Sequence, residues 1–207
     1  MNVVTVTAIA EQAAPEAVPT ARGRLLAGLA ASIKARGYRD TKIADIVAHA
    51  KTSRRTFYEV FETKDDCFLA LLHDLHQQMI ANVTASVDPA APWDEQVKAG
   101  ITAWIASMGA EPEIGISWVR EFPSLGTRAA DAQRAAMRDL SQLLTTLTSN
   151  PEMRRAGIEP VSSARAAILL GGLRELAAGV AETGGDIHAI TDEAVSAALA
   201  LLGPKPR

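Results

Sequence analysis

The sequence has few of the residues on which several common protein classes depend. Its 207 residues include one cysteine, which excludes an intramolecular disulfide framework and a cysteine-rich zinc site. Aromatic residues make up 4% of the chain, and runs of β-branched residues are rare. No stretch approaches the roughly 20 apolar residues of a membrane-spanning helix, and the N-terminus lacks a secretion signal. We therefore expect a cytoplasmic protein with no membrane partner.

The sequence also lacks a recognisable catalytic arrangement. His73 and His76 are spaced to share one helix face and could share a metal ion, but no nearby Cys or His completes a set, so a solvated face is favoured. The glycine pairs at 171–172 and 184–185 lack a phosphate-loop pattern. We expect neither an enzyme nor a cofactor. A small enzyme on a helical bundle stays open, and it would need a bound metal ion or cofactor.

Hydrophobic residues, many of them Ala and Leu, make up 48% of the chain. This composition favours helices, and apolar residues recur at helical spacing along most of the sequence. The sequence therefore predicts an all-α fold of about nine helices. We expect them over residues 20–36, 41–50, 54–61, 64–88, 92–109, 112–122, 125–148, 161–182 and 187–202.

Charge is distributed unevenly along the chain, whose net charge is −3. Residues 20–64 contain ten Lys or Arg and four acids, whereas residues 65–207 contain 11 cations and 18 acids. A basic segment on an acidic body indicates binding to a polyanion, although charge alone leaves an ordinary solvated surface open. Residues 1–19 contain no Lys or Arg, so a flexible tail is favoured over an arm that contacts DNA.

The basic segment has the pattern of a helix-turn-helix. Lys51 and Thr52 form the expected turn, and Gly37 is placed to end the first helix. The expected N-terminal caps are Thr20, Thr41, Ser53 and Thr63. On the helix after the turn, Phe57 and Phe61 fall on one side and Arg55 and Glu59 on the other. A half-buried helix with such an outward face suits the major groove of DNA, although an ordinary polar surface helix has the same pattern.

Residues 20–72 resemble the DNA-binding domain of TetR-type (tetracycline-repressor-like) transcriptional regulators. The resemblance rests on Ile43, Ala44 and Ile46 after Thr41, on Ser53-x-x-Thr56-Phe57-Tyr58-x-x-Phe61, and on Lys64 followed by an acid. It implies an all-α homodimer with a three-helix DNA-binding domain and a larger ligand-binding domain. We accordingly expect a tail at residues 1–19, a helix-turn-helix domain at 20–66, and an effector-binding and dimerisation domain at 67–207.

The resemblance also implies that seven residues contact DNA, namely Thr41, Ser53, Arg54, Arg55, Thr56, Tyr58 and Lys64. Thr52 in the turn and Glu59 on the outward face complete the candidate DNA-binding residues. Arg54 and Arg55 stand where the family often contacts bases, and Lys64 would contact a phosphate. Two departures are notable. Lys51 replaces the usual glycine of the turn and must either adopt a strained backbone or reshape the turn. Glu59 and Val60 replace the aromatic or His residues that are common after the Tyr. Glu59 can orient Arg55 toward a guanine edge from one helical turn away, accept a hydrogen bond from cytosine, or contact nothing.

The later helices divide into two groups by composition. The middle helices concentrate aromatic and Met side chains, which predict an apolar effector pocket, although such residues also form ordinary cores. The candidate pocket residues are Trp104, Met108, Trp118, Phe122, Met137, Leu140 and Leu144. The last two helices combine apolar and small residues and predict a helix pair that dimerises as a four-helix bundle, or else completes a monomer core. The candidate interface residues are Ile168, Leu169, Gly172, Leu176, Val195, Leu199 and Leu202.

Together these features predict a homodimeric repressor that binds a palindromic site in double-stranded DNA. A small hydrophobic or aromatic effector would release it through linkage between ligand and DNA binding. The alternative is a small-molecule-binding helical dimer without specific DNA binding.

Overall fold

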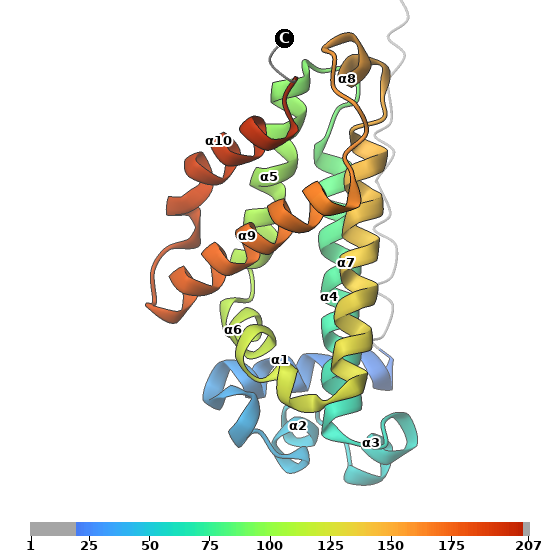
Figure 1. Ribbon diagram of the computed structural model, residues 1–207. Helices are drawn as coiled ribbons and strands as arrows, with labels where there is room; N and C mark the ends of the chain where they lie inside the picture. Colours follow the sequence, from blue (N-terminus) through green and yellow to red (C-terminus); the bar gives the residue numbers. More distant parts are fainter. Residues whose placement is uncertain (1–19, 205–207) are drawn as a thin grey trace, which may run out of the picture.

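The computed structural model describes the backbone of residues 20–204, with all side chains except those of Phe122 and Pro123. The predicted tail at residues 1–19 lies outside this range. Every regular element within it is a helix, so the predicted all-α fold is confirmed (Figure 1). No described helix is both long and apolar enough to cross a lipid bilayer.

The first three helices and the start of the long fourth helix form the lower end of the molecule in Figure 1. They are α1 (Ala21–Asp40), α2 (Ile43–His49), α3 (Arg54–Val60) and α4 (Lys64–Ser86). The body contains α5 (Trp93–Gly109), α6 (Pro112–Arg120), α7 (Thr127–Leu147), α8 (Pro151–Arg155), α9 (Ser163–Glu182) and α10 (Thr191–Leu202), with 3-10 turns η1 (Phe122–Leu125) and η2 (Ile187–Ile190). The sequence predicted only a connection where α8 lies.

Three of the four predicted caps are present. The hydroxyls of Thr20, Ser53 and Thr63 each accept a hydrogen bond from the backbone N–H three residues later, at 3.1 Å in every case. Each satisfies one of the N–H groups that the start of a helix leaves without a partner. The sequence therefore located the starts of α1, α3 and α4 correctly.

The predicted cap at Thr41 is wrong. Its buried hydroxyl donates instead to the Gly37 carbonyl oxygen, at 2.7 Å. The start of α2 is closed by Asp45, whose carboxylate accepts from the Lys42 N–H at 2.9 Å. Gly37 has a φ of 76° and interrupts α1, as predicted, although a last helical turn continues to Asp40. Thr41 thus fastens the end of α1 and not the start of α2.

Two hydrophobic clusters make up the core, and α4 contributes to both. The lower cluster joins α1, α2 and α3 to the first half of α4 through residues such as Leu29, Ile46, Phe57 and Phe68. The upper cluster joins the second half of α4, from Met79 onwards, to the helices of the body. One continuous helix therefore links the two ends of the protein.

Ion pairs fasten the lower end to the rest of the protein. Arg22 on α1 pairs with Asp74 on α4 through two hydrogen bonds of 2.7 and 2.8 Å. Lys34 on α1 lies 2.6 Å from Glu111, the residue before α6, and Arg128 on α7 pairs with Asp66 on α4.

Candidate DNA-binding surface and ligand cavity

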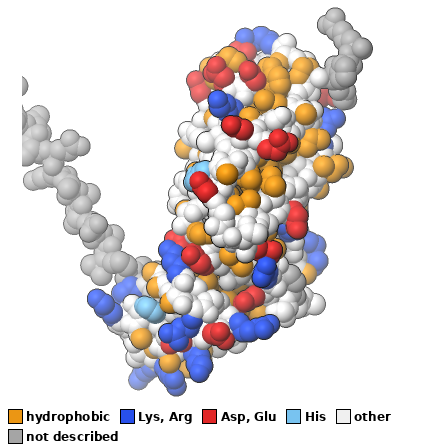
Figure 2. All heavy atoms as spheres, turned by 90° about the vertical axis from the view of Figure 1, so that its left-hand side faces the viewer, with side chains coloured by type: hydrophobic (Ala, Val, Ile, Leu, Met, Phe, Trp, Pro, Cys, Tyr) orange, Lys and Arg blue, Asp and Glu red, His pale blue; other side chains and the backbone are white. Residues whose placement is uncertain are grey.

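Helix α3 is held by aromatic residues on its inner side and presents polar residues on its outer side. Phe57 and Phe61 are buried, with ring centroids 5.9 Å apart. The Arg55 side chain is 89% exposed and the Tyr58 residue 57%. Figure 2 shows Lys and Arg side chains gathered at this end of the molecule. The surface has the shape and charge that a groove-reading helix requires.

Arg55 and Glu59 form an ion pair on this outer face. The Arg55 Nε donates to the Glu59 Oε1 at 3.0 Å, one helical turn away. This is the contact between Glu59 and Arg55 on which one of the sequence-based alternatives depends. Arg54, beside Arg55, is also exposed.

The turn before α3 has a strained backbone at Lys51. Its φ is 49°, and it is the one non-glycine residue in the described range with a positive φ. This value lies in the left-handed region, which side chains with a Cβ adopt at a cost. Of the two outcomes that the sequence allowed for Lys51, the protein adopts the strained one.

Two of the residues predicted to contact DNA point into the protein. Thr41 is buried, and the Lys64 ammonium donates to the carbonyl oxygens of Tyr38 at 2.8 Å and Thr41 at 2.9 Å. Lys64 also lies 4.1 Å from the centroid of the Tyr38 ring, and burial lowers its pKa. Tyr38 in turn stacks on Phe68, at 4.2 Å between centroids. Lys64 thus binds the carbonyls at the end of α1 in this structure.

The other seven predicted contact residues are placed together on α3 and the turn before it. Thr52 and Thr56 are partly exposed, and Ser53, Arg54, Arg55, Tyr58 and Glu59 are exposed. Ser53 and Thr56 also contact each other, with 3.0 Å between their hydroxyl oxygens. One continuous surface therefore carries most of the residues that the resemblance implied.

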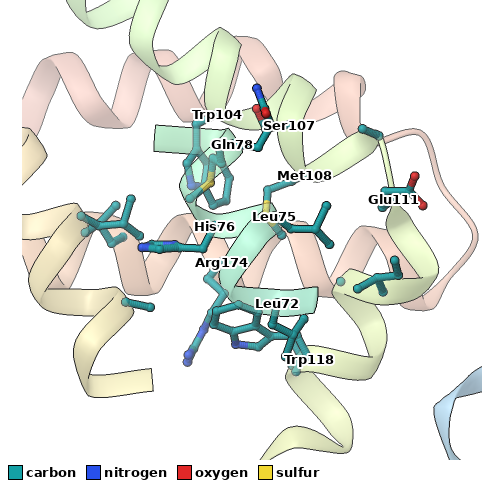
Figure 3. A pocket seen from close by; sticks show the side chains of 18 of the residues that line it. Leu72, Leu75, His76, Gln78, Trp104, Ser107, Met108, Glu111, Trp118 and Arg174 are labelled. Atoms are coloured by element: carbon teal, nitrogen blue, oxygen red, sulfur yellow. The ribbon is translucent and has the colours of Figure 1, made fainter. Parts of the chain in front are cut away.

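A cavity of about 200 Å³ lies in the lower body, between α4, α5, α6, α7 and α9 (Figure 3). Five of the seven predicted pocket residues line it, namely Trp104, Met108, Trp118, Met137 and Leu140. Leu144 instead lines a smaller apolar space of about 60 Å³, and the two spaces share Trp104, Leu140 and Leu170. Phe122 belongs to η1, and its side chain lies outside the described part.

Several polar residues of the cavity were missed by the sequence analysis. His76 is 5% exposed, with its Nε2 3.6 Å from the Asp139 Oδ2, and burial is the main cause that lowers its pKa. Arg174 and Glu111 also line the cavity. His76 and Arg174 both occupy the apolar stripes of their helices, where a polar residue is unusual, and this was the available signal.

The predicted dimer residues divide between surface and core. Ile168 is 65% exposed, Leu176 is 39% exposed, and Gly172 lies exposed between them on α9. Leu169 and Leu202 are buried within the chain, and Val195 and Leu199 are partly buried. Figure 2 faces the side of the molecule on which α9 and α10 lie, and it shows apolar side chains across the middle of the body. No group of three His, Cys, Asp or Glu suited to a metal ion occurs in the described range.

Comparisons with known proteins support this description. Residues 25–71 match the sequence profile of "Bacterial regulatory proteins, tetR family". Among curated proteins, no match was found.

Solved structures resemble nearly the whole chain. The fatty acid degradation regulator FadR from Bacillus halodurans has a TM-score of 0.76 at 16% identity, over 90% of this chain and 97% of that one. FadR from Bacillus subtilis, in complex with stearoyl-CoA, has a TM-score of 0.69 at 15% identity, over 86% and 98%. A tetR-family regulatory protein from Rhodococcus RHA1 has a TM-score of 0.68 at 19% identity, over 91% and 100%. Residues 25–71 therefore match the tetR family of bacterial regulatory proteins, and the fold of the chain is that of solved tetR-type structures.

Proposed function

We propose that this protein is a sequence-specific DNA-binding regulator, and that it acts as a homodimeric repressor released by a small hydrophobic or aromatic effector. The observation that carries the proposal is the path of α4. Its first turn binds the end of α1 through Lys64, and residues from Leu72 to Asn82 line the cavity. A ligand that moves this wall of the cavity therefore acts directly on the DNA-binding end.

The outer face of α3 supports DNA binding. Arg54 and Arg55 can reach base edges, while Tyr58 and the hydroxyls near the start of the helix can reach phosphates. The ion pair of Arg55 with Glu59 favours one orientation of the guanidinium before DNA binds, which reduces the conformational freedom lost on binding.

Exposed apolar residues on α9 support a dimer. Ile168, Gly172 and Leu176 follow one another at helical spacing, so one side of α9 offers a continuous apolar strip with a small residue at its centre. Such a strip suits an isologous interface, in which the same helix of each protomer meets its mate. Leu169 and Leu202 would support these helices from behind, because both are buried in the protomer.

The cavity supports control by an apolar ligand. Its lining of Trp, Met and Leu side chains is typical of small-molecule sites. The Bacillus subtilis FadR structure, which has a similar fold, holds stearoyl-CoA. That complex supports an apolar ligand here without identifying it.

Selection of bound fragments from a random DNA pool tests the DNA-binding part of the proposal. We expect a two-fold symmetric consensus from wild type and none from Arg55→Ala. Arg138→Ala, which changes an exposed arginine on α7 far along the chain from α3, serves as the control and should return the wild-type consensus. Binding without sequence preference would instead support a helical dimer that binds small molecules only.

Light scattering tests the dimer. We expect wild type to have twice the protomer mass and Ile168→Glu/Leu176→Glu to have the protomer mass, because each charge would be buried at the interface. The variant should keep the wild-type circular dichroism spectrum, since both side chains are exposed in the protomer. A wild type that is monomeric at all concentrations contradicts the proposed assembly.

A further inference from the structure

The ligand cavity contains a positive charge that the described part of the protein does not neutralise. Arg174 on α9 lines the cavity, and its Nε is buried without a hydrogen-bond partner. Arg174 takes part in none of the ion pairs between described residues. A buried guanidinium donor without an acceptor is costly, which suggests that the acceptor is supplied from outside.

None of the described acidic residues in or beside the cavity forms an ion pair with Arg174. Glu111, the one acid that lines the cavity, lies 2.6 Å from Lys34. Asp139 faces His76, and Glu182 on α9 accepts from Arg120 at 2.6 Å. Asp186 accepts from the His188 N–H at 2.9 Å and forms no ion pair with Arg174. No described carboxylate therefore forms an ion pair with Arg174.

The position of Arg174 indicates which part of a ligand it would meet. A second cavity of about 150 Å³ adjoins the first, and the two share Met108, Gly115, Val119 and Arg174. The first cavity is lined mainly by apolar residues, whereas the second is also lined by Asp186 and His188. Arg174 thus lies where an apolar space meets a more polar one, which suits the polar end of an amphipathic ligand.

We propose that the cavity binds an apolar monocarboxylate. The guanidinium of Arg174 binds its carboxylate, and Trp104, Met108 and Trp118 surround its apolar part (Figure 3). Guanidinium and carboxylate match in a planar, two-bond geometry and in charge. A phosphate dianion would need more than one cation in so apolar a place. The Nε2 of His76, also buried without a hydrogen-bond partner, offers a second polar atom on the α4 side of the cavity.

This inference rests on the proposed effector cavity, but it concerns ligand chemistry and can be tested without DNA. Tryptophan fluorescence serves as the readout, because two of the three tryptophans line the cavity. The ligands are decanoate and 2-naphthoate, each compared with its methyl ester. The ester keeps the apolar part and removes the charge, so the hydrophobic contribution alone would favour the ester.

We expect wild type to bind at least one of the acids roughly tenfold or more tightly than its ester, as a charge-assisted hydrogen bond allows. Arg174→Gln should lose this preference while still binding the ester, and Arg174→Lys should keep part of it. Arg138→Gln, which removes an exposed positive charge outside both cavities, should behave as wild type. Circular dichroism and thermal unfolding check that each variant folds.

Three results would overturn the inference. The first is equal affinity of wild type for acid and ester. The second is a folded Arg174→Gln that loses affinity for acid and ester equally. The third is a wild type that binds neither acid. The comparison of acid with ester in wild type tests the inference even if Arg174→Gln does not fold. Acid binding that leaves DNA affinity unchanged would support the carboxylate site but contradict the effector role. The two proposals can therefore fail separately.

Discussion

The Lys34 ammonium lies 2.6 Å from the Glu111 carboxylate, and this ion pair joins the N-terminal helices to the wall of the cavity. Lys34 belongs to α1, while Glu111 immediately precedes α6, whose Ile114, Gly115 and Trp118 also line the cavity. Helices α1 and α6 pack against each other beside this pair. A second contact, besides α4, therefore connects the cavity wall to the N-terminal helices.

Breaking this pair should weaken the coupling between effector binding and DNA binding more than it weakens either binding event alone. Both side chains are partly exposed, so the pair contributes only about 0–1 kcal/mol. We expect Lys34→Met to reduce effector-induced loss of DNA affinity by up to roughly fivefold, as measured by fluorescence anisotropy. Glu111→Gln should have a similar effect, and the double variant should add little. Arg36→Met, which breaks the pair with Asp45 inside the DNA-binding domain, is the control.

The Arg55–Glu59 pair should set DNA preference. We expect Arg55→Ala to lose roughly 1–3 kcal/mol on the selected site and little on random DNA. Glu59→Ala should retain overall affinity and change the preferred base beside the guanidinium contact. An unchanged preference in DNA selection with Glu59→Ala would leave the glutamate without a part in specificity.

Lys64 should contribute to folding as well as to DNA binding. Its ammonium binds two backbone carbonyls and lies over the Tyr38 ring, so Lys64→Met should lower the free energy of unfolding by roughly 1–2 kcal/mol in urea. If Lys64 also contacts a phosphate, Lys64→Met should weaken binding to all DNA sequences by a similar factor. It should also flatten the dependence of DNA affinity on salt concentration by about one unit of slope. An unchanged slope would restrict Lys64 to its structural part.

Replacing Lys51 with glycine should stabilise the protein. Glycine adopts the observed φ of 49° without a Cβ clash, although it gains more freedom in the unfolded chain. The left-handed conformation costs roughly 1–2 kcal/mol for a residue with a Cβ, so we expect a net gain of about 0.5–1 kcal/mol. Thermal unfolding measures this gain, and Thr52→Gly in the same turn should lack it.

The buried His76 should make the protein less stable in acid. Burial holds the pKa of His76 below its ordinary value of 6.5, although Asp139 opposes this and His73 reinforces it. The unfolded chain therefore binds the proton more readily, and stability is lost as pH falls below about 6.5 towards the lowered pKa. We expect His76→Gln to lose less stability than wild type between pH 7 and 5 in urea unfolding. His49→Gln, at an exposed site, should follow wild type.

The sequence predicted the helices well where local chemistry determines them. Ser53 and Thr63 cap the helices that follow them because a hydroxyl three residues before a free N–H needs no tertiary partner. Thr41 has the same local pattern, but its hydroxyl binds the Gly37 carbonyl, because the end of α1 competes for it. The competing partner is the Gly37 carbonyl of α1, and the local pattern that predicts a cap for α2 does not include it.

The cavity residues also divide into those that the sequence could identify and those that only the fold brings together. Trp104, Met108 and Trp118 could be identified as candidates because aromatic and Met residues concentrate in the middle helices. His76 and Arg174 belong to helices on either side of the cavity and nearly 100 residues apart, so no spacing brings them together in the sequence. Their lack of hydrogen-bond partners is visible only in the folded chain.

The length of α4 determines how far a small tilt of this helix displaces the lower end of the molecule. Its 23 residues extend about 35 Å at 1.5 Å per residue. A tilt of about 5° around its far end would displace its first turn, and the bound end of α1, by about 3 Å. That distance is close to the ~3.4 Å between successive base pairs. A tilt of a few degrees is thus enough to move the N-terminal helices by about the spacing of one base pair.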